Sequence, residues 1–181
     1  MKWRRWLINL SVVALLIGID ALVKSGATLC IAPIQTYSQL YPFGGIPVFE
    51  HILGIDFTLG YVQNKGAAWG MLSSHPQLLM ALRTLFILFL LPILFYTKKD
   101  KRIERVCYLL ILGGALGNYF DMLKQGYVVD LFYFHFFGQE FPLFNVADSL
   151  IFIGGFSLLL HDILIKKRKV TGQAAKECSK P

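Results

Sequence analysis

Two aspartates stand out as groups that could do chemistry together. Asp130 ends the run 127–130, and Asp148 ends the run 144–148, each beside an apolar stretch. Two ionised carboxylates that share a site repel each other, so the pKa of one rises and it keeps its proton while the other stays charged. Such a pair provides a general acid and a general base at one pH, which suits hydrolysis of an amide by water. The alternative is that both aspartates only cap or flank helices, because Asp is favoured in a first helical turn.

The segments that must position these aspartates are strongly apolar. Of the 181 residues, 55% are hydrophobic and only 16% are charged, and the mean hydropathy is +0.55. Ordinary soluble domains have about a quarter of their residues charged, so this composition argues against a water-soluble globular protein. Four stretches have roughly the 20 residues that cross a bilayer core: 6–23, 76–97, 103–122 and 145–165. The sequence therefore predicts a mainly α membrane protein with four transmembrane helices.

The basic residues indicate the topology. Of the 18 Lys and Arg residues, 14 lie in three clusters, at 2–5, 98–105 and 166–180. With four crossings these clusters share one side, as the preference for positive charge in cytoplasmic loops requires. Both termini are expected in the cytoplasm, and residues 166–181 are expected to form a basic, disordered tail. The charges flank spans and do not gather among aromatic residues on one face, which argues against nucleic-acid binding.

The first span also resembles a cleavable secretory signal, because it has a basic start and ends near the small residues 25–27. Asp20 and Lys24 favour a retained span. They lie four residues apart on one helix face, where the two charges can pair.

Two segments are expected on the outer side. Residues 26–75 hold several turn-forming prolines and glycines, and residues 57–63 alternate like a half-buried strand. We predict a small extramembrane β-sheet there, formed by segment 28–75, as part of a single membrane domain spanning residues 1–165. The shorter segment, 123–144, is rich in phenylalanine and is expected to lie in the membrane interface.

The sequence argues against metal, disulfide and serine chemistry. The three cysteines show no paired spacing, and no serine has an identifiable Lys or His base nearby. No two histidines share the face of a zinc-binding helix; they are His51, His75, His135 and His161. We expect neither a metal site nor a cofactor.

Five blocks carry a stronger signal than spacing alone. They are Asp20 with Lys24, residues 64–70 (NKGAAWG), residues 113–121 (GGALGNYFD), residues 128–130 (VVD) and residues 141–149 (FPLFNVADS). In this order, over residues 6–165, they resemble the motif set of lipoprotein signal peptidase, also called signal peptidase II.

The resemblance implies an intramembrane aspartic endopeptidase. Such an enzyme removes the signal peptide of a diacylglyceryl-modified prolipoprotein just before the lipidated cysteine. Asp130 and Asp148 would be its catalytic pair. The remaining motif residues would support the pair or bind substrate: Asn64, Gly66, Asn118, Asp121, Asn145, Asp20 and Lys24. The resemblance further implies a place in the bacterial inner membrane, with membrane lipids and prolipoproteins as partners and with segment 28–75 as a cradle over an outward-facing site. We expect a monomer, although the sequence leaves the oligomeric state open.

One departure concerns the glycine-rich block. The family commonly has Arg after its last aspartate, where this chain has Met122, and Lys124 is a candidate to compensate for the missing charge. Arg83, early in the second span, is expected to extend to the membrane surface.

A different class of protein is also considered. In a small four-span proton-coupled transporter, Asp121, Asp130 and Asp148 would relay ions. Transporters usually place such groups near the membrane midplane, whereas Asp130 and Asp148 are expected toward one face. A scaffold without chemistry would make both carboxylates dispensable.

Overall fold

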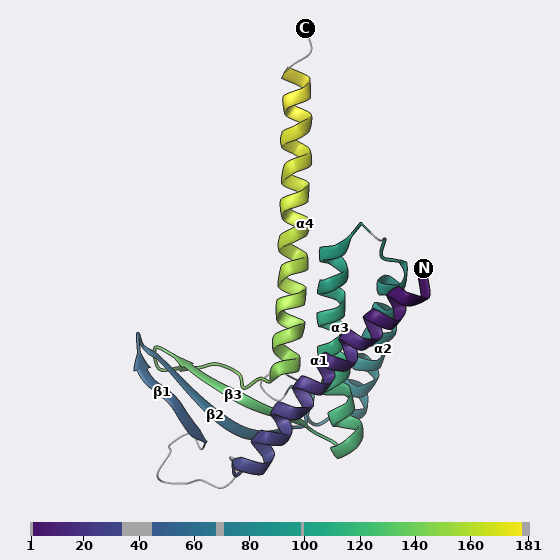
Figure 1. The fold of residues 1–181 in the computed structure, drawn as a ribbon. Helices are drawn as coiled ribbons and strands as arrows, with labels where there is room; N and C mark the ends of the chain where they lie inside the picture. The colour runs from purple at the N-terminus through teal and green to yellow at the C-terminus, as the bar shows by residue number, and fades with distance from the viewer. Residues whose placement is uncertain (1, 34–44, 68–70, 99, 179–181) are drawn as a thin grey trace.

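The computed structural model describes residues 2–33, 45–67, 71–98 and 100–178. Within these residues, four helices form a bundle with a small sheet at one end (Figure 1). The helices are α1 (Lys2–Cys30), α2 (Pro76–Tyr96), α3 (Arg102–Gln125) and α4 (Val146–Cys178). Each is long and apolar enough to cross a membrane. The predicted fold class, four transmembrane helices with a small extramembrane sheet, is confirmed.

Helix α3 occupies the centre of the bundle and contacts the other three helices. Its buried Leu109, Ile111 and Leu112 pack with Val13 of α1 and with Leu90 of α2. Small residues allow the closest approaches, as is common between helices in membranes. A Cβ added at Gly113 would lie 2.9 Å from the Leu16 side chain of α1.

The sheet is antiparallel, with strand order β1-β2-β3-β4. The strands are β1 (Ile46–Ile52), β2 (Ile55–Asn64), β3 (Val128–Phe136) and β4 (Gln139–Glu140). Strand β2 contains the predicted strand at 57–63. Strand β3 was not predicted: its alternating phenylalanines form part of a sheet face, where Phe134 stacks on Phe57 and on Phe144.

The helix ends differ from the predicted spans. Helix α1 continues to Cys30, past the expected end at residue 23, because no proline intervenes before Pro33. Helix α4 extends to Cys178, although a disordered tail was expected from residue 166. That stretch contains the good helix formers Lys, Arg, Gln, Ala and Glu and no proline, which explains the continuation.

The elements are arranged with the sheet at one end of the bundle and the chain ends at the other. The start of α1, the α2–α3 connection and the far end of α4 all lie away from the sheet (Figure 1). These are the regions of the three basic clusters, so the clusters lie at the end of the bundle opposite the sheet.

Candidate active site

Asp130 is delivered to the site by a turn and a strand. Helix α3 ends at Gln125 and is capped by Gly126, whose φ of 77° lies in the left-handed region that glycine adopts without steric cost. The chain then enters β3 directly, where Asp130 lies opposite Val62 of β2. Its side chain is only 3% exposed. A buried carboxyl must be hydrogen-bonded, and the partners of Asp130 define the site.

Asp148 lies in the first turn of α4, and Asn145 immediately precedes that helix. The Asp148 backbone N–H donates to Oδ1 of Asn145 at 2.9 Å, and the Asn145 backbone N–H donates to Oδ2 of Asp148 at 3.2 Å. This reciprocal arrangement is a capping box, which satisfies two backbone donors at a helix start. The expected capping role of Asp148 is therefore present.

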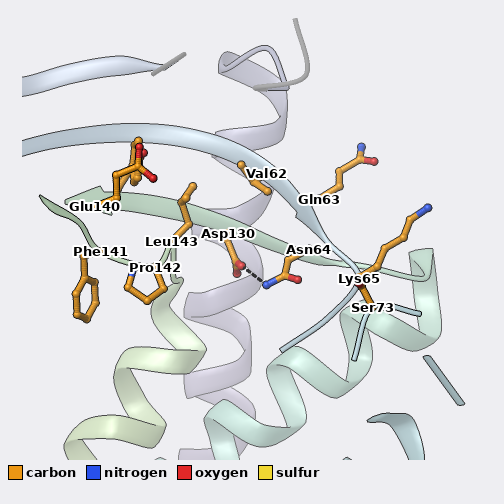
Figure 2. Close-up of a pocket in the computed structure, with 11 residues that line it drawn as sticks. Val62, Gln63, Asn64, Lys65, Ser73, Asp130, Glu140, Phe141, Pro142 and Leu143 are labelled. Atoms are coloured by element: carbon orange, nitrogen blue, oxygen red, sulfur yellow. Dashed lines mark hydrogen bonds between the residues drawn. The ribbon is translucent and has the colours of Figure 1, made fainter. Parts of the chain in front are cut away.

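Asn145 also connects the two carboxyls. Its Nδ2 donates to Oδ1 of Asp130 at 2.9 Å, so one fully buried side chain contacts Asp130 while its backbone contacts Asp148. The second oxygen of Asp130 accepts a 2.8 Å hydrogen bond from Asn64 Nδ2 (Figure 2). Asn64 is itself oriented by the Gly66 backbone N–H, which donates to its Oδ1 at 2.8 Å.

Asn118 of α3 supports the second carboxyl. Its Nδ2 donates to Oδ1 of Asp148 at 2.7 Å. Its own Oδ1 accepts hydrogen bonds from Asn145 Nδ2 at 3.1 Å and from Lys24 Nζ at 3.0 Å. Because both sides of the amide are engaged, Asn118 cannot rotate without losing several hydrogen bonds, so it holds Asp148 in one orientation.

A buried ion cluster lies behind these amides. Lys24 Nζ lies 2.6 Å from Oδ2 of Asp20 and 2.7 Å from Oδ2 of Asp121. Oδ1 of Asp20 accepts a 2.8 Å hydrogen bond from the Ala147 backbone N–H, one of the donors that a helix start leaves unpaired. A Cβ added at Gly117 would lie 2.8 Å from Asp20 Oδ2, so glycine provides the space for this carboxylate.

The structure thus brings together every site residue expected from the sequence. The Gly66 backbone contacts Asn64, and the three asparagines contact the two aspartates. Asn118 then connects this group to Lys24 and its two carboxylates. The contacts form one continuous polar network drawn from five helices and strands: α1, α3, α4, β2 and β3.

Burial dominates the electrostatics of Asp130. Loss of water, together with the negative charge of Asp148, raises the pKa of Asp130 to about 7, against the opposing effect of hydrogen bonds from Asn64 and Asn145. Near neutral pH the pair therefore readily keeps a proton. The two carboxyls titrate as a unit.

A pocket of about 610 Å³ opens onto Asp130 (Figure 2). This volume lies within the usual range for ligand sites. Tyr133 lines the pocket, and burial together with Glu140 raises the pKa of its hydroxyl to about 12. Its other lining residues come from β2 and the loop that follows it, from β3 and β4, and from the segment before α4: Val62, Gln63, Asn64, Lys65, Ser73, Asp130, Glu140, Phe141, Pro142 and Leu143.

Two charged residues differ from expectation. Lys124 is exposed, and the cation that pairs with Asp121 is Lys24, so the suggested compensation by Lys124 has no support in these contacts. Arg83 does not extend into solvent. It is half-buried and donates from Nη2 to the Gly66 carbonyl at 3.1 Å. No sequence motif marked Arg83, because its partner lies in a loop whose path depends on the sheet.

Comparison with known proteins decides the family. The family model described as signal peptidase (SPase) II matches residues 12–164. The chain belongs to the signal peptidase II family. Signal peptidase II enzymes are membrane proteases of lipoprotein processing, and the four apolar helices agree with that setting.

Individual relatives of the signal peptidase II family cover most of the chain. The lipoprotein signal peptidase of Clostridium tetani is 35% identical over 137 residues, which is 74% of this chain and 86% of that protein. The lipoprotein signal peptidase of Haemophilus ducreyi is 38% identical over 148 residues, or 78% of this chain and 91% of that protein.

Solved structures share the fold. One is a bacterial membrane enzyme with 26% sequence identity and a TM-score of 0.65. The match covers 90% of this chain and 91% of that enzyme. A second, at 25% identity and a TM-score of 0.67, covers 85% of this chain, with 91% of its own length matched.

Proposed function

We propose that this signal peptidase II family member is an aspartic endopeptidase that cleaves diacylglyceryl-modified prolipoproteins just before the lipidated cysteine. Asp130 and Asp148 are its catalytic residues. The observation that carries the proposal is the bridge through Asn145, which hydrogen-bonds to both carboxyls. Asn64 and Asn118 engage one further oxygen of each, so both carboxyls are oriented before substrate arrives.

The mechanism follows from one shared proton. The ionised carboxyl takes a proton from a water molecule, whose oxygen attacks the carbonyl carbon of the scissile amide. The protonated carboxyl donates a hydrogen bond to the carbonyl oxygen and stabilises the developing negative charge. Collapse of the tetrahedral species breaks the C–N bond, and the departing nitrogen receives a proton from the pair, which restores its starting state.

The position of the pair suits a lipid-linked substrate. Asp130 lies where the sheet meets the helix bundle, and the pocket beside it lies between β2 and the segment before α4. A signal helix in the bilayer places its cleavage site at this level while the acyl chains stay in the membrane. We assign the sheet to the outer face of the bacterial inner membrane and both chain ends to the cytoplasm, because the basic clusters lie at the opposite end of the bundle. We also treat the monomer as the working unit.

The test is cleavage of a purified diacylglyceryl-modified precursor by the purified protein. The parent should release the signal peptide, whereas Asp130→Asn and Asp148→Asn should each lose at least about a thousandfold in rate with the fold retained. Asp100→Asn serves as the control, because it changes an exposed carboxyl outside the network. Equal cleavage by the parent and both aspartate variants would remove the proposed catalytic pair. A parent that couples proton flux to solute uptake in vesicles, without cleavage, would favour the transporter.

A further inference from the structure

Arg83 of α2 is held in an unusual way for an arginine in a membrane span. Nη2 donates to the Gly66 carbonyl at 3.1 Å, while Nη1 is buried and has no hydrogen-bond partner among the described residues. A buried donor left unpaired costs about 1–3 kcal/mol. A long basic side chain normally avoids that cost by extending to water. Something in this site therefore favours an inward guanidinium.

The carboxyls of the site supply that attraction. The negative charges of Asp148, Asp130 and Asp121 all act favourably on Arg83. Among the described residues, however, no carboxylate oxygen lies within 4.0 Å of the guanidinium. Arg83 thus contributes positive charge at longer range. The oxygens of the aspartate pair accept hydrogen bonds from the asparagines.

Arg83 also contacts the loop that orients Asp130. The Gly66 carbonyl accepts from Arg83, and the Gly66 N–H donates to Asn64, whose amide in turn donates to Asp130. A single residue, Gly66, therefore links the arginine to the asparagine, and the chain of contacts to Asp130 is short.

The charge balance around the pair depends on few cations. Among the described residues of the network, four buried or half-buried carboxyls face two cations, Lys24 and Arg83. Lys24 already pairs with Asp20 and Asp121. The other titratable groups near the site lie toward the pocket or the sheet: Lys65, Glu140, Tyr133 and the hydrogen-bonded hydroxyls of Tyr61 and Tyr127.

We infer that Arg83 is a positioning residue of the aspartate pair, which anchors the Asn64 loop through Gly66 and whose charge keeps one of the two carboxyls ionised. The inference rests on the proposed function, because it assigns how that pair stays in its working state. Without Arg83, the pair faces one positive charge fewer and binds a second proton more readily. The doubly protonated pair lacks a base and cannot activate water.

The experiment is a pH–rate profile of precursor cleavage for the parent, Arg83→Gln and Arg83→Lys. In Arg83→Gln the acidic limb should move to higher pH by about one unit, so that the loss of kcat relative to the parent is largest on the acidic limb and shrinks toward the pH optimum. In Arg83→Lys the charge remains but the planar fork is lost. Its acidic limb should stay with that of the parent, and its rate should fall at all pH values by a similar factor.

Arg105→Gln is the matched control. Arg105 likewise has a buried, unpartnered nitrogen among the described residues and donates to a backbone carbonyl, that of Lys98, but at the other end of the bundle. Its acidic limb should coincide with that of the parent. If Arg83→Gln does not fold, the Arg83→Lys profile tests the inference instead. Lysine keeps the positive charge, so a displaced acidic limb in Arg83→Lys would contradict the proposed role of that charge.

The outcomes separate the two proposals. A parent that does not cleave the precursor overturns the proposed function. A parent that cleaves, with an Arg83→Gln profile that is unshifted or flat at every pH, overturns the role of Arg83 and leaves the aspartate pair in place.

Discussion

Asn145 and Asp148 satisfy each other's hydrogen bonds at the start of α4, so the residue that caps the helix also fixes one carboxyl of the pair. The same asparagine side chain reaches Asp130 on β3. Helix capping and orientation of the site are therefore separable functions of a single residue, because the first uses Oδ1 and the second uses Nδ2.

Asn145→Ser should separate these functions. Serine caps a helix about as well as asparagine, so the helix start is kept, but buried acceptors of Asn118, Val129 and Asp130 lose the amide donor, and the unfolding free energy should fall by about 1–3 kcal/mol. The shorter side chain cannot reach Asp130, and cleavage should fall by about a hundredfold. Thermal unfolding and precursor cleavage measure the two effects. Cleavage at the parental rate would show that the contact with Asp130 is dispensable.

The pH dependence should show an alkaline limb near neutrality. The pKa of Asp130 is raised to about 7, so this carboxyl is protonated below that pH and ionised above it. The proposed mechanism needs one shared proton, and kcat should therefore decline as the pH rises through about 7.

The cause of that pKa can be tested directly. In Asp148→Asn, the Asp130 carboxyl loses a negative neighbour, so its carbonyl infrared band should disappear at lower pH than in the parent. Burial is the largest cause and is retained, so the midpoint should remain above the ordinary value of 3.8. An unchanged midpoint would mean that the two carboxyls do not interact.

Lys24→Met should be among the most destabilising single changes. It leaves Asp20 and Asp121 without their cation, and removing one partner of a buried ion pair costs about 3–5 kcal/mol. The double variant Asp20→Asn with Lys24→Met should recover part of the loss, because an amide Oδ1 still accepts from the Ala147 N–H. Additive losses in denaturant unfolding would argue against coupling between these residues.

Gly114→Ala should impair both folding and cleavage. A Cβ at this position would press against the Ala147 carbonyl oxygen and displace the first turn of α4. Gly155→Ala is the control, since its Cβ would meet no heavy atom of the described residues within 4 Å. Equal Tm values for the two variants would contradict the tight α3–α4 contact.

Phe141→Ala should weaken substrate capture with little loss of stability. The Phe141 ring is 46% exposed and lines the pocket, whereas Phe144 packs against Phe132 and Phe134. KM should rise several-fold in Phe141→Ala, while Phe144→Ala should mainly lower Tm. A KM unchanged by removal of the Phe141 ring would exclude it from the binding surface.

The helices could be predicted from sequence because hydropathy and charge clusters are local patterns, and α2 begins and ends within a residue of its predicted span. The residues around Asp130 and Asp148 could be named because the motif blocks resemble those of a known family. Strand β3 could not be recognised in the same way. Its phenylalanines also suit a membrane interface, and its partner β2 lies far away in sequence.

The contact of Arg83 with the Asn64 loop could not be predicted from the sequence for a related reason. Its hydrogen bond joins α2 to a loop that follows β2, and the position of that loop is set by pairing between Asn64 and Val128 across the sheet. Contacts of this kind depend on how separate elements meet, and no spacing within one segment encodes them.

The polar network draws its groups from the first turn of one helix, the C-terminal halves of two others and two separate strands. No fragment of the chain, and no stage of insertion that lacks either the first or the last helix, contains a complete set of these groups. With the proposed catalytic pair, proteolytic activity therefore arises only on full assembly, and a partly inserted chain cannot cleave neighbouring proteins in the bilayer.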